Sequence, residues 1–186
     1  MGNARRLLRL DGEFPMHRGG TLVQPTLAYE TWGELNADRS NAVLIFTGLS
    51  PSAHATSSPA DPSPGWWEEV IGPGRAIDTR RYFVICVNSL GSCFGSTGAS
   101  SIDPLTGEPY RLSFPVLSLE DVARGAREVV RYLQIERLNT VLGPSMGGMS
   151  GLAFEIMFPG ISDGLVIISS GSRSLPFATA LRSLQR

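Results

Sequence analysis

Residues 143–147, "GPSMG", are the part of this sequence best suited to chemistry. The G-x-S-x-G spacing is typical of a serine held in a strained turn between a strand and a helix, with its hydroxyl exposed. Glycines stand two positions away on either side because side chains there would collide with the serine. The spacing therefore predicts Ser145 as a nucleophile. A glycine-rich strand-to-helix turn without chemistry is the alternative interpretation.

The sequence around Ser145 predicts the elements that would position it. An amphipathic helix is expected after Ser118, which can cap it, with Asp121 in its first turn, and another is expected from about Gly148. This alternation predicts an open α/β fold, in which ligands bind at the carboxyl ends of the strands. Apolar runs typical of strands, the later ones continuous as in a covered parallel sheet, lie at residues 26–31, 42–46, 82–87, 140–142 and 165–168.

A serine nucleophile needs donors for the negative charge that develops during acyl transfer. One donor is expected to be the backbone N–H after the nucleophile, here Met146, and the other comes from the loop after the third strand. In the loop "FTGLSPSAH" that second N–H belongs to Leu49. The helix after Ser145 would also direct its positive N-terminus at the site.

Long loops follow two of the predicted strands, at residues 47–65 and 88–110. Loops of this length in a compact domain are more often functional than not. Their content of serine, glycine and proline is also compatible with a disordered linker. Burial of Trp66, Trp67 and Tyr110 would favour ordered loops, since large aromatic side chains pack against other residues.

Composition excludes several other classes of function. The net charge of −1 gives no basis for nucleic-acid binding, and no apolar run is long enough to cross a membrane. The polar start argues against a secretory signal, so we expect a cytoplasmic protein with Cys86 and Cys93 reduced. His17 and His54 lie far apart without ligand-spaced partners, so no metal is expected. The stretch "GSCFGSTG" lacks the lysine of a P-loop.

Several longer stretches resemble the homoserine O-acyltransferase family of α/β-hydrolase-fold enzymes. These stretches are "LAYETWGELN", "GWWEEVIGPGRAID", "YFVICVNSLGSCFGSTGASSIDPLTGEPY" and "GPSMGGM". The resemblance implies an enzyme of methionine or cysteine biosynthesis that transfers an acyl group from acyl-CoA to the hydroxyl of L-homoserine or L-serine. It implies Ser145 as the nucleophile that forms an acyl-serine, and acyl-CoA as a co-substrate without a bound cofactor.

Two places depart from the pattern of the acetyltransferases in this family. Residues 48–52 read "GLSPS" where acetyltransferases usually read "ALTGD", so the acceptor amino acid stays open. Arg182 stands where acetyltransferases tend to carry asparagine, and a guanidinium can hold a carboxylate with two hydrogen bonds, which favours succinyl-CoA. A solvated helix charge is the other interpretation of Arg182. By resemblance, the residues expected at the substrate pocket are Gly48, Ser50, Pro51, Ser52, His54 and Arg182.

The sequence lacks a catalytic base in the expected place. Hydrolase-fold triads run serine, then acid, then histidine along the chain, but no histidine follows His54, and Asp163 has none to orient. Members of the family are longer, with a helical lid and further strands. We therefore expect residues 1–186 to be one incomplete N-terminal α/β-hydrolase domain, inactive alone, in which the lid begins near residue 175. The resemblance implies a homodimer for the complete enzyme.

Two other functions stay open. A serine esterase would use the same nucleophile but admit water to the acyl-serine. A non-catalytic α/β module would serve binding or assembly, although retention of the whole G-x-S-x-G segment argues against it. An amino acid and acyl-CoA are the expected partners of the transferase.

Overall fold

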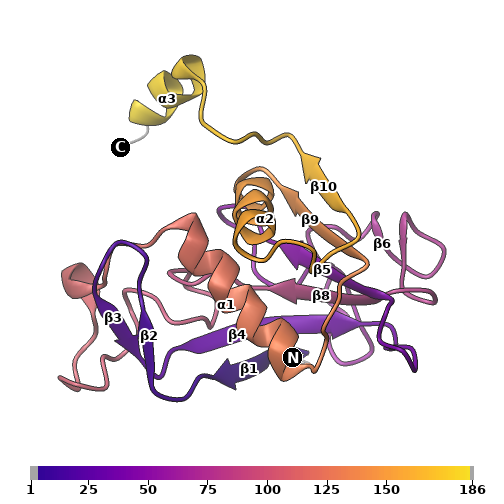
Figure 1. Ribbon diagram of the computed structural model, residues 1–186, viewed down its shortest axis with the longest axis horizontal. Helices are drawn as coiled ribbons and strands as arrows, with labels where there is room; N and C mark the ends of the chain where they lie inside the picture. The colour runs from indigo at the N-terminus through magenta and orange to yellow at the C-terminus, as the bar shows by residue number, and fades with distance from the viewer. Residues whose placement is uncertain (1–3, 185–186) are drawn as a thin grey trace.

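The computed structural model describes residues 4–184. Their main element is a six-stranded sheet, which has two helices packed on one face and a long loop region on the other (Figure 1). Along the sheet the strands are β1 (Arg6–Arg9), β4 (Thr26–Trp32), β8 (Phe83–Val87), β5 (Ala42–Phe46), β9 (Thr140–Pro144) and β10 (Leu165–Ile168). β4 pairs antiparallel with β1 and β8, whereas the pairs β8–β5, β5–β9 and β9–β10 are parallel. The prediction of an α/β fold with a mostly parallel sheet is confirmed.

The remaining elements are three helices, a 3-10 turn and two small sheets. They are β2 (Glu13–Pro15) with β3 (Thr21–Val23), β6 (Ile71–Gly72) with β7 (Ile77–Asp78), η1 (Arg111–Ser113), α1 (Leu119–Tyr132), α2 (Met146–Met157) and α3 (Pro176–Ser183). Each predicted apolar run corresponds to a strand of the six-stranded sheet: β4, β5, β8, β9 or β10. The sequence patterns do not predict β1, β2, β3, β6 or β7, which are short. Within residues 4–184, none of the helices combines the length and apolar character needed to cross a bilayer.

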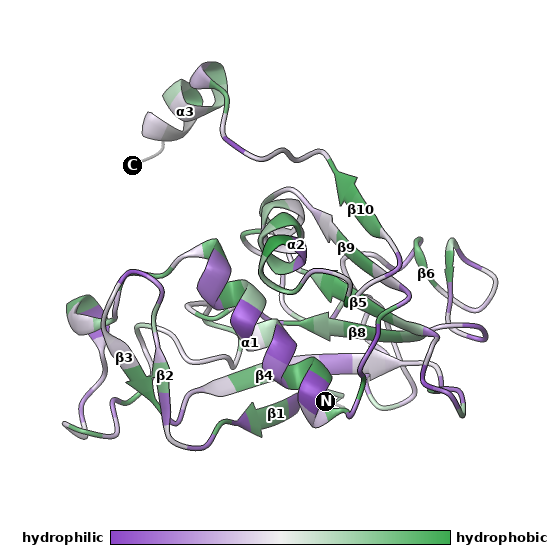
Figure 2. Ribbon diagram, in the orientation of Figure 1, coloured by the Kyte–Doolittle hydropathy of each residue, from purple (hydrophilic) through white to green (hydrophobic). Residues whose placement is uncertain are grey.

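Each face of the sheet buries its own apolar cluster. Successive residues of a strand point to opposite faces. On β5, Leu44 and Phe46 pack with residues of α1 and α2, whereas Val43 and Ile45 pack with residues of the loop region 47–81. Because both faces are covered, β5 is buried throughout, and its sequence is a continuous apolar run. Figure 2 shows the hydrophobic character of this strand and of β8.

The start of α1 is fixed by a capping box. The Ser118 hydroxyl accepts a hydrogen bond from the Asp121 N–H, and the Asp121 carboxylate accepts one from the Ser118 N–H at 3.0 Å. The same buried carboxylate accepts the N–H of His17 at 2.7 Å. Asp121 therefore ties the N-terminus of α1 to the turn between β2 and β3, and the predicted capping by Ser118 is confirmed.

The far edge of the sheet and the last helix are less covered than the core. β10 is the edge strand beside β9, and Val166 and Ile168 are 43% and 41% exposed. α3 stands clear of the sheet in Figure 1, and its side chains Phe177 and Leu181 are exposed. Cys86 is buried and Cys93 is exposed, and both are free cysteines.

Candidate active site

Ser145 occupies the turn between β9 and α2 in a strained backbone conformation. Its φ of 53° and ψ of −122° lie in a region that residues other than glycine rarely adopt, at a cost of about 1–3 kcal/mol. The Ser145 N–H donates to the Ile168 carbonyl at 2.9 Å, and its carbonyl accepts the Gly148 N–H at 3.0 Å. The serine is exposed, and α2 starts directly after it at Met146, two residues earlier than expected.

The two flanking glycines are required by backbone contacts. A Cβ on Gly143 would lie 2.2 Å from the carbonyl group of Gly147, and a Cβ on Gly147 would lie 2.4 Å from the Phe46 carbonyl oxygen. The sequence interpretation expects collisions with the serine itself, but the structure shows them between β9, α2 and the end of β5. Because these two positions lack side chains, the backbones of β9, α2 and the end of β5 can approach one another closely next to Ser145. This close approach permits the sharp turn at Ser145.

The two residues predicted to supply oxyanion donors line one cavity beside this turn. Leu49, which is 81% exposed, and Met146 both border a cavity of about 470 Å³. Within residues 4–184, neither backbone N–H donates to a protein acceptor. Gly48 is buried with the Pro144 carbonyl nearby, since a Cβ on this glycine would lie 3.9 Å from that oxygen. The loop after β5 therefore runs alongside the turn that carries Ser145.

The rest of this cavity combines an apolar floor with a few polar groups. Leu90, Leu117 and Val122 contribute apolar surface, and Arg18 and Glu120 are its charged residues. Glu120 accepts hydrogen bonds from its own backbone N–H and from Ser118, which lower its pKa, and the nearby His17 and Arg18 act in the same direction. The cavity therefore offers apolar surface together with charged groups of both signs.

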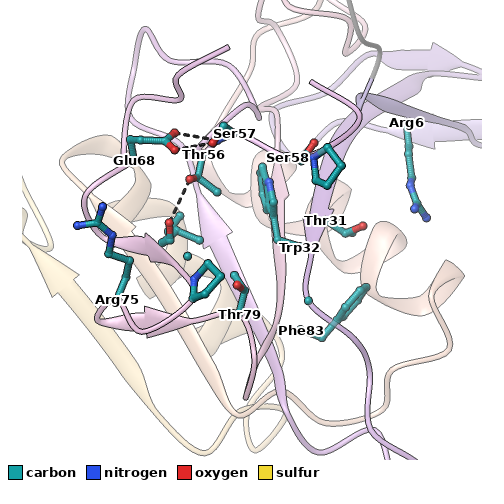
Figure 3. A pocket seen from close by; sticks show the side chains of 15 residues that line it. Arg6, Thr31, Trp32, Thr56, Ser57, Ser58, Glu68, Arg75, Thr79 and Phe83 are labelled. Atoms are coloured by element: carbon teal, nitrogen blue, oxygen red, sulfur yellow. Dashed lines mark hydrogen bonds between the residues drawn. The ribbon is translucent and has the colours of Figure 1, made fainter. Parts of the chain in front are cut away.

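A second cavity, of about 570 Å³, lies near the amino-terminal end of β8, away from the carboxyl ends of the parallel strands (Figure 3). Phe83, the first residue of β8, lines it together with Trp32, Arg6 and Arg75. In Figure 3 the carboxylate of Glu68 accepts hydrogen bonds from Ser57, whose hydroxyl and N–H donate at 2.5 and 2.8 Å. Together with a hydrogen bond from the Gly65 N–H at 3.0 Å, these bonds lower the pKa of Glu68 to about 2. No serine in this cavity has the strained turn of Ser145.

Residues 41–184 match a family described as the alpha/beta hydrolase fold. The chain belongs to the α/β-hydrolase fold family. In this fold the nucleophile stands between a strand and a helix at the carboxyl end of the sheet, where the structure places Ser145.

The chain is also similar to particular α/β-hydrolase proteins. It is 58% identical to a serine O-succinyltransferase of Litchfieldella anticariensis over the whole chain and 51% of that protein. A homoserine O-acetyltransferase structure from Bacillus anthracis matches 95% of the chain and 49% of that protein, with a TM-score of 0.87 and 34% identity. The structure of esterase E22 matches 97% of the chain and 51% of that protein, with a TM-score of 0.87 and 33% identity.

The predicted resemblance to acyltransferases of the α/β-hydrolase fold is therefore confirmed. The chain spans about half the length of the relatives that it matches.

Both ring nitrogens of His54, which lies in the loop after β5, are at hydrogen-bond distance from protein oxygens. Its Nδ1 is 2.9 Å from the Glu30 carboxylate, and its Nε2 is 2.8 Å from the Ser63 carbonyl oxygen. Burial by itself would lower the pKa of His54, but the Ser63 carbonyl and the Glu30 carboxylate together raise it above its ordinary value. Neither ring nitrogen is left to bind a substrate.

The other residues predicted at the substrate pocket lie between Leu49 and His54. Ser50 is exposed, and Pro51 lies against Gly48, where a glycine Cβ would be 3.6 Å from its Cδ. The Ser52 hydroxyl accepts the His54 N–H at 3.2 Å, and its carbonyl accepts the Trp66 indole N–H at 2.9 Å. Trp66 is half-buried and packs on the core, as does Trp67, so this loop is ordered.

Two further sequence expectations concern the C-terminal part of the chain. Arg182 belongs to α3, but its side chain lies outside the described residues. Asp163 pairs with Arg137, whose Nε donates to its carboxylate at 2.7 Å. Within residues 4–184, no three His, Cys, Asp or Glu residues form a group that could hold a metal ion.

Sequence reasoning missed Arg18 and the Glu30–His54 pair. Arg18 lies in the turn between two strands that the patterns do not predict, and it reaches the cavity only through the packing of that turn against α1. Glu30 lies within the quoted stretch "LAYETWGELN", but no local spacing connects it with His54. Both relationships arise from long-range packing.

Proposed function

We propose that this chain is the nucleophile-bearing part of an O-acyltransferase that moves an acyl group from acyl-CoA to the hydroxyl of an amino acid. The observation that carries the proposal is the exposed Ser145 in its strained turn, beside a cavity lined by Leu49 and Met146. The backbone N–H groups of these two residues donate to no acceptor within residues 4–184. A nucleophile next to two unpaired donors suits a reaction in which negative charge develops on a carbonyl oxygen.

The proposed reaction has two steps. The Ser145 oxygen bonds to the thioester carbon while the Leu49 and Met146 amides hold the oxyanion, and then the carbon–sulfur bond breaks. CoA leaves as the thiol, carrying the proton taken from Ser145. The amino-acid hydroxyl oxygen next bonds to the acyl carbon, the bond from that carbon to the Ser145 oxygen breaks, and the hydroxyl proton returns to Ser145. Each oxyanion donor contributes about 3–4 kcal/mol to the transition state.

The proton of Ser145 requires an acceptor, and within residues 4–184 no histidine is among the residues that line the cavity beside it. His54 has both nitrogens engaged, and His17 lies beside Glu120 rather than among the residues of the cavity. We therefore propose that the base lies in a part of the protein outside these 186 residues, in keeping with relatives of about twice this length. On this proposal residues 1–186 are one incomplete domain, the segment from about residue 175 begins a lid, and the chain alone is inactive.

For the substrates we propose L-serine and succinyl-CoA, with L-homoserine and acetyl-CoA as the other pair to be tested. Relatives named serine O-succinyltransferase, at 58% and 60% identity, support this choice. A succinyl group ends in a carboxylate, and either Arg182 or Arg18 could hold it. Methionine or cysteine biosynthesis, a cytoplasmic location and a homodimeric complete enzyme belong to the same proposal.

The test uses the full-length gene product. It is incubated with succinyl-CoA or acetyl-CoA, and mass spectrometry of its proteolytic peptides locates the acyl adduct. We expect the adduct on Ser145, its loss in Ser145→Ala, and transfer to an added amino acid. Ser150→Ala is the matched control, because this serine lies one turn along α2 and donates only to the Met146 carbonyl. An adduct that persists in Ser145→Ala would refute the proposed nucleophile.

A serine esterase is the second candidate function, favoured by the likeness to esterase E22. Both reactions share the acyl-serine, so the ratio of acyl transfer to hydrolysis distinguishes them. We expect transfer to exceed hydrolysis when L-serine or L-homoserine is present. Hydrolysis unaffected by either amino acid would favour the esterase.

A further inference from the structure

The ring of His54 lies between two groups that accept hydrogen bonds. The Glu30 carboxylate is 2.9 Å from Nδ1, and the Ser63 carbonyl oxygen is 2.8 Å from Nε2. A neutral imidazole carries one N–H and satisfies one of these acceptors, whereas an imidazolium satisfies both. The arrangement therefore retains an additional proton, which belongs on the imidazole because it is more basic than a carboxylate.

This pair is well shielded from solvent. The side chains of Glu30 and His54 are 5% and 16% exposed, and within residues 4–184 His54 is the only cation that pairs with Glu30. Removing the charge of one partner would leave the other charge buried and unpaired, which is strongly destabilising. The remaining titratable groups that face the pair are Asp61, on the same loop, and the thiol of Cys86, opposite Glu30 on β8.

His54 connects the loop after β5 to the sheet. Glu30 belongs to β4, and Ser63 lies near the far end of the same loop. The loop closes on itself next to His54, since the Trp67 N–H donates to the Ala55 carbonyl at 2.7 Å. Leu49 lies in the same loop, five residues before His54, and it lines the cavity next to Ser145.

We propose that His54 is a positioning residue: its imidazolium, held between Glu30 and Ser63, fixes residues 47–54 so that the Leu49 amide stays at the cavity. Loss of the proton breaks one of the two contacts and loosens this segment. The catalytic consequence rests on the proposed acyl transfer, whereas the clamp itself is a property of the fold.

The structural half of the test needs no substrate. In the full-length protein, NMR titration of His54 and hydrogen exchange of the amides in residues 47–55 are measured for the wild type and for His54→Gln. We expect His54 to titrate above its ordinary pKa and the variant to exchange at least tenfold faster in this segment. His17→Gln, the matched control at an exposed histidine, should leave exchange unchanged. A wild-type His54 that titrates at or below its ordinary value would overturn the proposal.

The catalytic half measures acylation of Ser145 against pH. We expect His54→Gln to lower kcat at least tenfold with KM changed less than twofold, and to remove an alkaline decline that the wild type shows. Glu30→Gln keeps a hydrogen-bonding side chain and should reproduce these effects if His54→Gln does not fold. Normal acylation in both variants would overturn the positioning role. If no acyl-serine forms in the wild type while hydrogen exchange behaves as expected, the proposed function fails and the clamp stands.

Discussion

A Cβ atom placed on Gly143 would lie 2.2 Å from the carbonyl group of Gly147. Real Cβ atoms do not approach backbone this closely, so β9 and α2 can meet only if residue 143 has no side chain. The contact links stability to chemistry, because the backbone between these glycines carries Ser145.

Gly143→Ala should therefore destabilise the protein by at least about 2 kcal/mol, since backbone rather than a flexible side chain must move. Urea unfolding measures the loss. Gly164→Ala is the control, because a Cβ there would have only ordinary contacts, at 3.8 Å, with the Asn139 carbonyl oxygen and the Thr140 hydroxyl. Equal stability of the two variants would contradict the steric interpretation of Gly143.

Ser145→Gly should raise stability while removing the nucleophile. The Ser145 φ of 53° is strained for serine but readily adopted by glycine, so we expect a gain of about 1 kcal/mol. Thermal unfolding of Ser145→Gly and Ser145→Ala, side by side, measures it, because alanine keeps the strain. No difference in Tm between the two variants would show that the turn stores no such strain.

Ser118→Ala should lower the free energy of unfolding by about 1 kcal/mol, because it removes the hydroxyl half of the capping box at the start of α1. Ser113→Ala is the comparison variant, because Ser113 is the last residue of η1 and its hydroxyl donates to the carbonyl of Tyr110, which precedes this turn. The effect is measured by urea unfolding, and a change below about 0.3 kcal/mol would argue that the box is not formed in solution.

The Glu30–His54 pair predicts that the free energy of unfolding decreases as the pH rises. The folded state raises the pKa of His54, despite its burial, through the Ser63 carbonyl and the Glu30 carboxylate. The stabilisation is therefore complete below the unfolded pKa of about 6.5 and is lost as the pH rises through the folded pKa. Urea unfolding between about pH 6 and pH 9 should show this decline in the wild type and a flatter profile in His54→Gln. Parallel profiles would exclude the linkage.

Arg18→Ala and Arg182→Ala address the acyl donor. A guanidinium that holds the succinyl carboxylate should favour succinyl-CoA over acetyl-CoA by about tenfold or more, since such charge-assisted bonds contribute about 1.5–3 kcal/mol. The ratio of kcat/KM for the two donors is measured in the full-length protein, with the exposed Arg173→Ala as the control. If the ratio of kcat/KM for the two donors is unchanged in both variants, neither arginine selects the acyl donor.

The sequence was informative where the signal is local. The G-x-S-x-G spacing located the strained turn, continuous apolar runs located the covered strands, and Ser118 with Asp121 located the start of α1. Short strands such as β1 escaped prediction because their few residues carry little periodic signal.

Relationships between distant segments could not be predicted in this way. Neither the approach of Arg18 to the cavity nor the pairing of Glu30 with His54 leaves a trace in local spacing, since both depend on how the elements pack. The resemblance suggests that His54 lines the pocket or belongs to its loop. The structure shows its ring between Glu30 and Ser63, a pairing that the resemblance did not indicate, and a role at the pocket stays a prediction.

The uncovered edge at β10 also affects how the polypeptide can be handled. Within residues 4–184 no further strand pairs with its outer side, and Val166 and Ile168 present apolar surface there. Main-chain groups on an open edge can recruit a strand from a second molecule, and such pairing grows with concentration. A preparation limited to these residues should therefore be kept dilute, and light scattering should guide the choice of buffer before crystallisation is attempted.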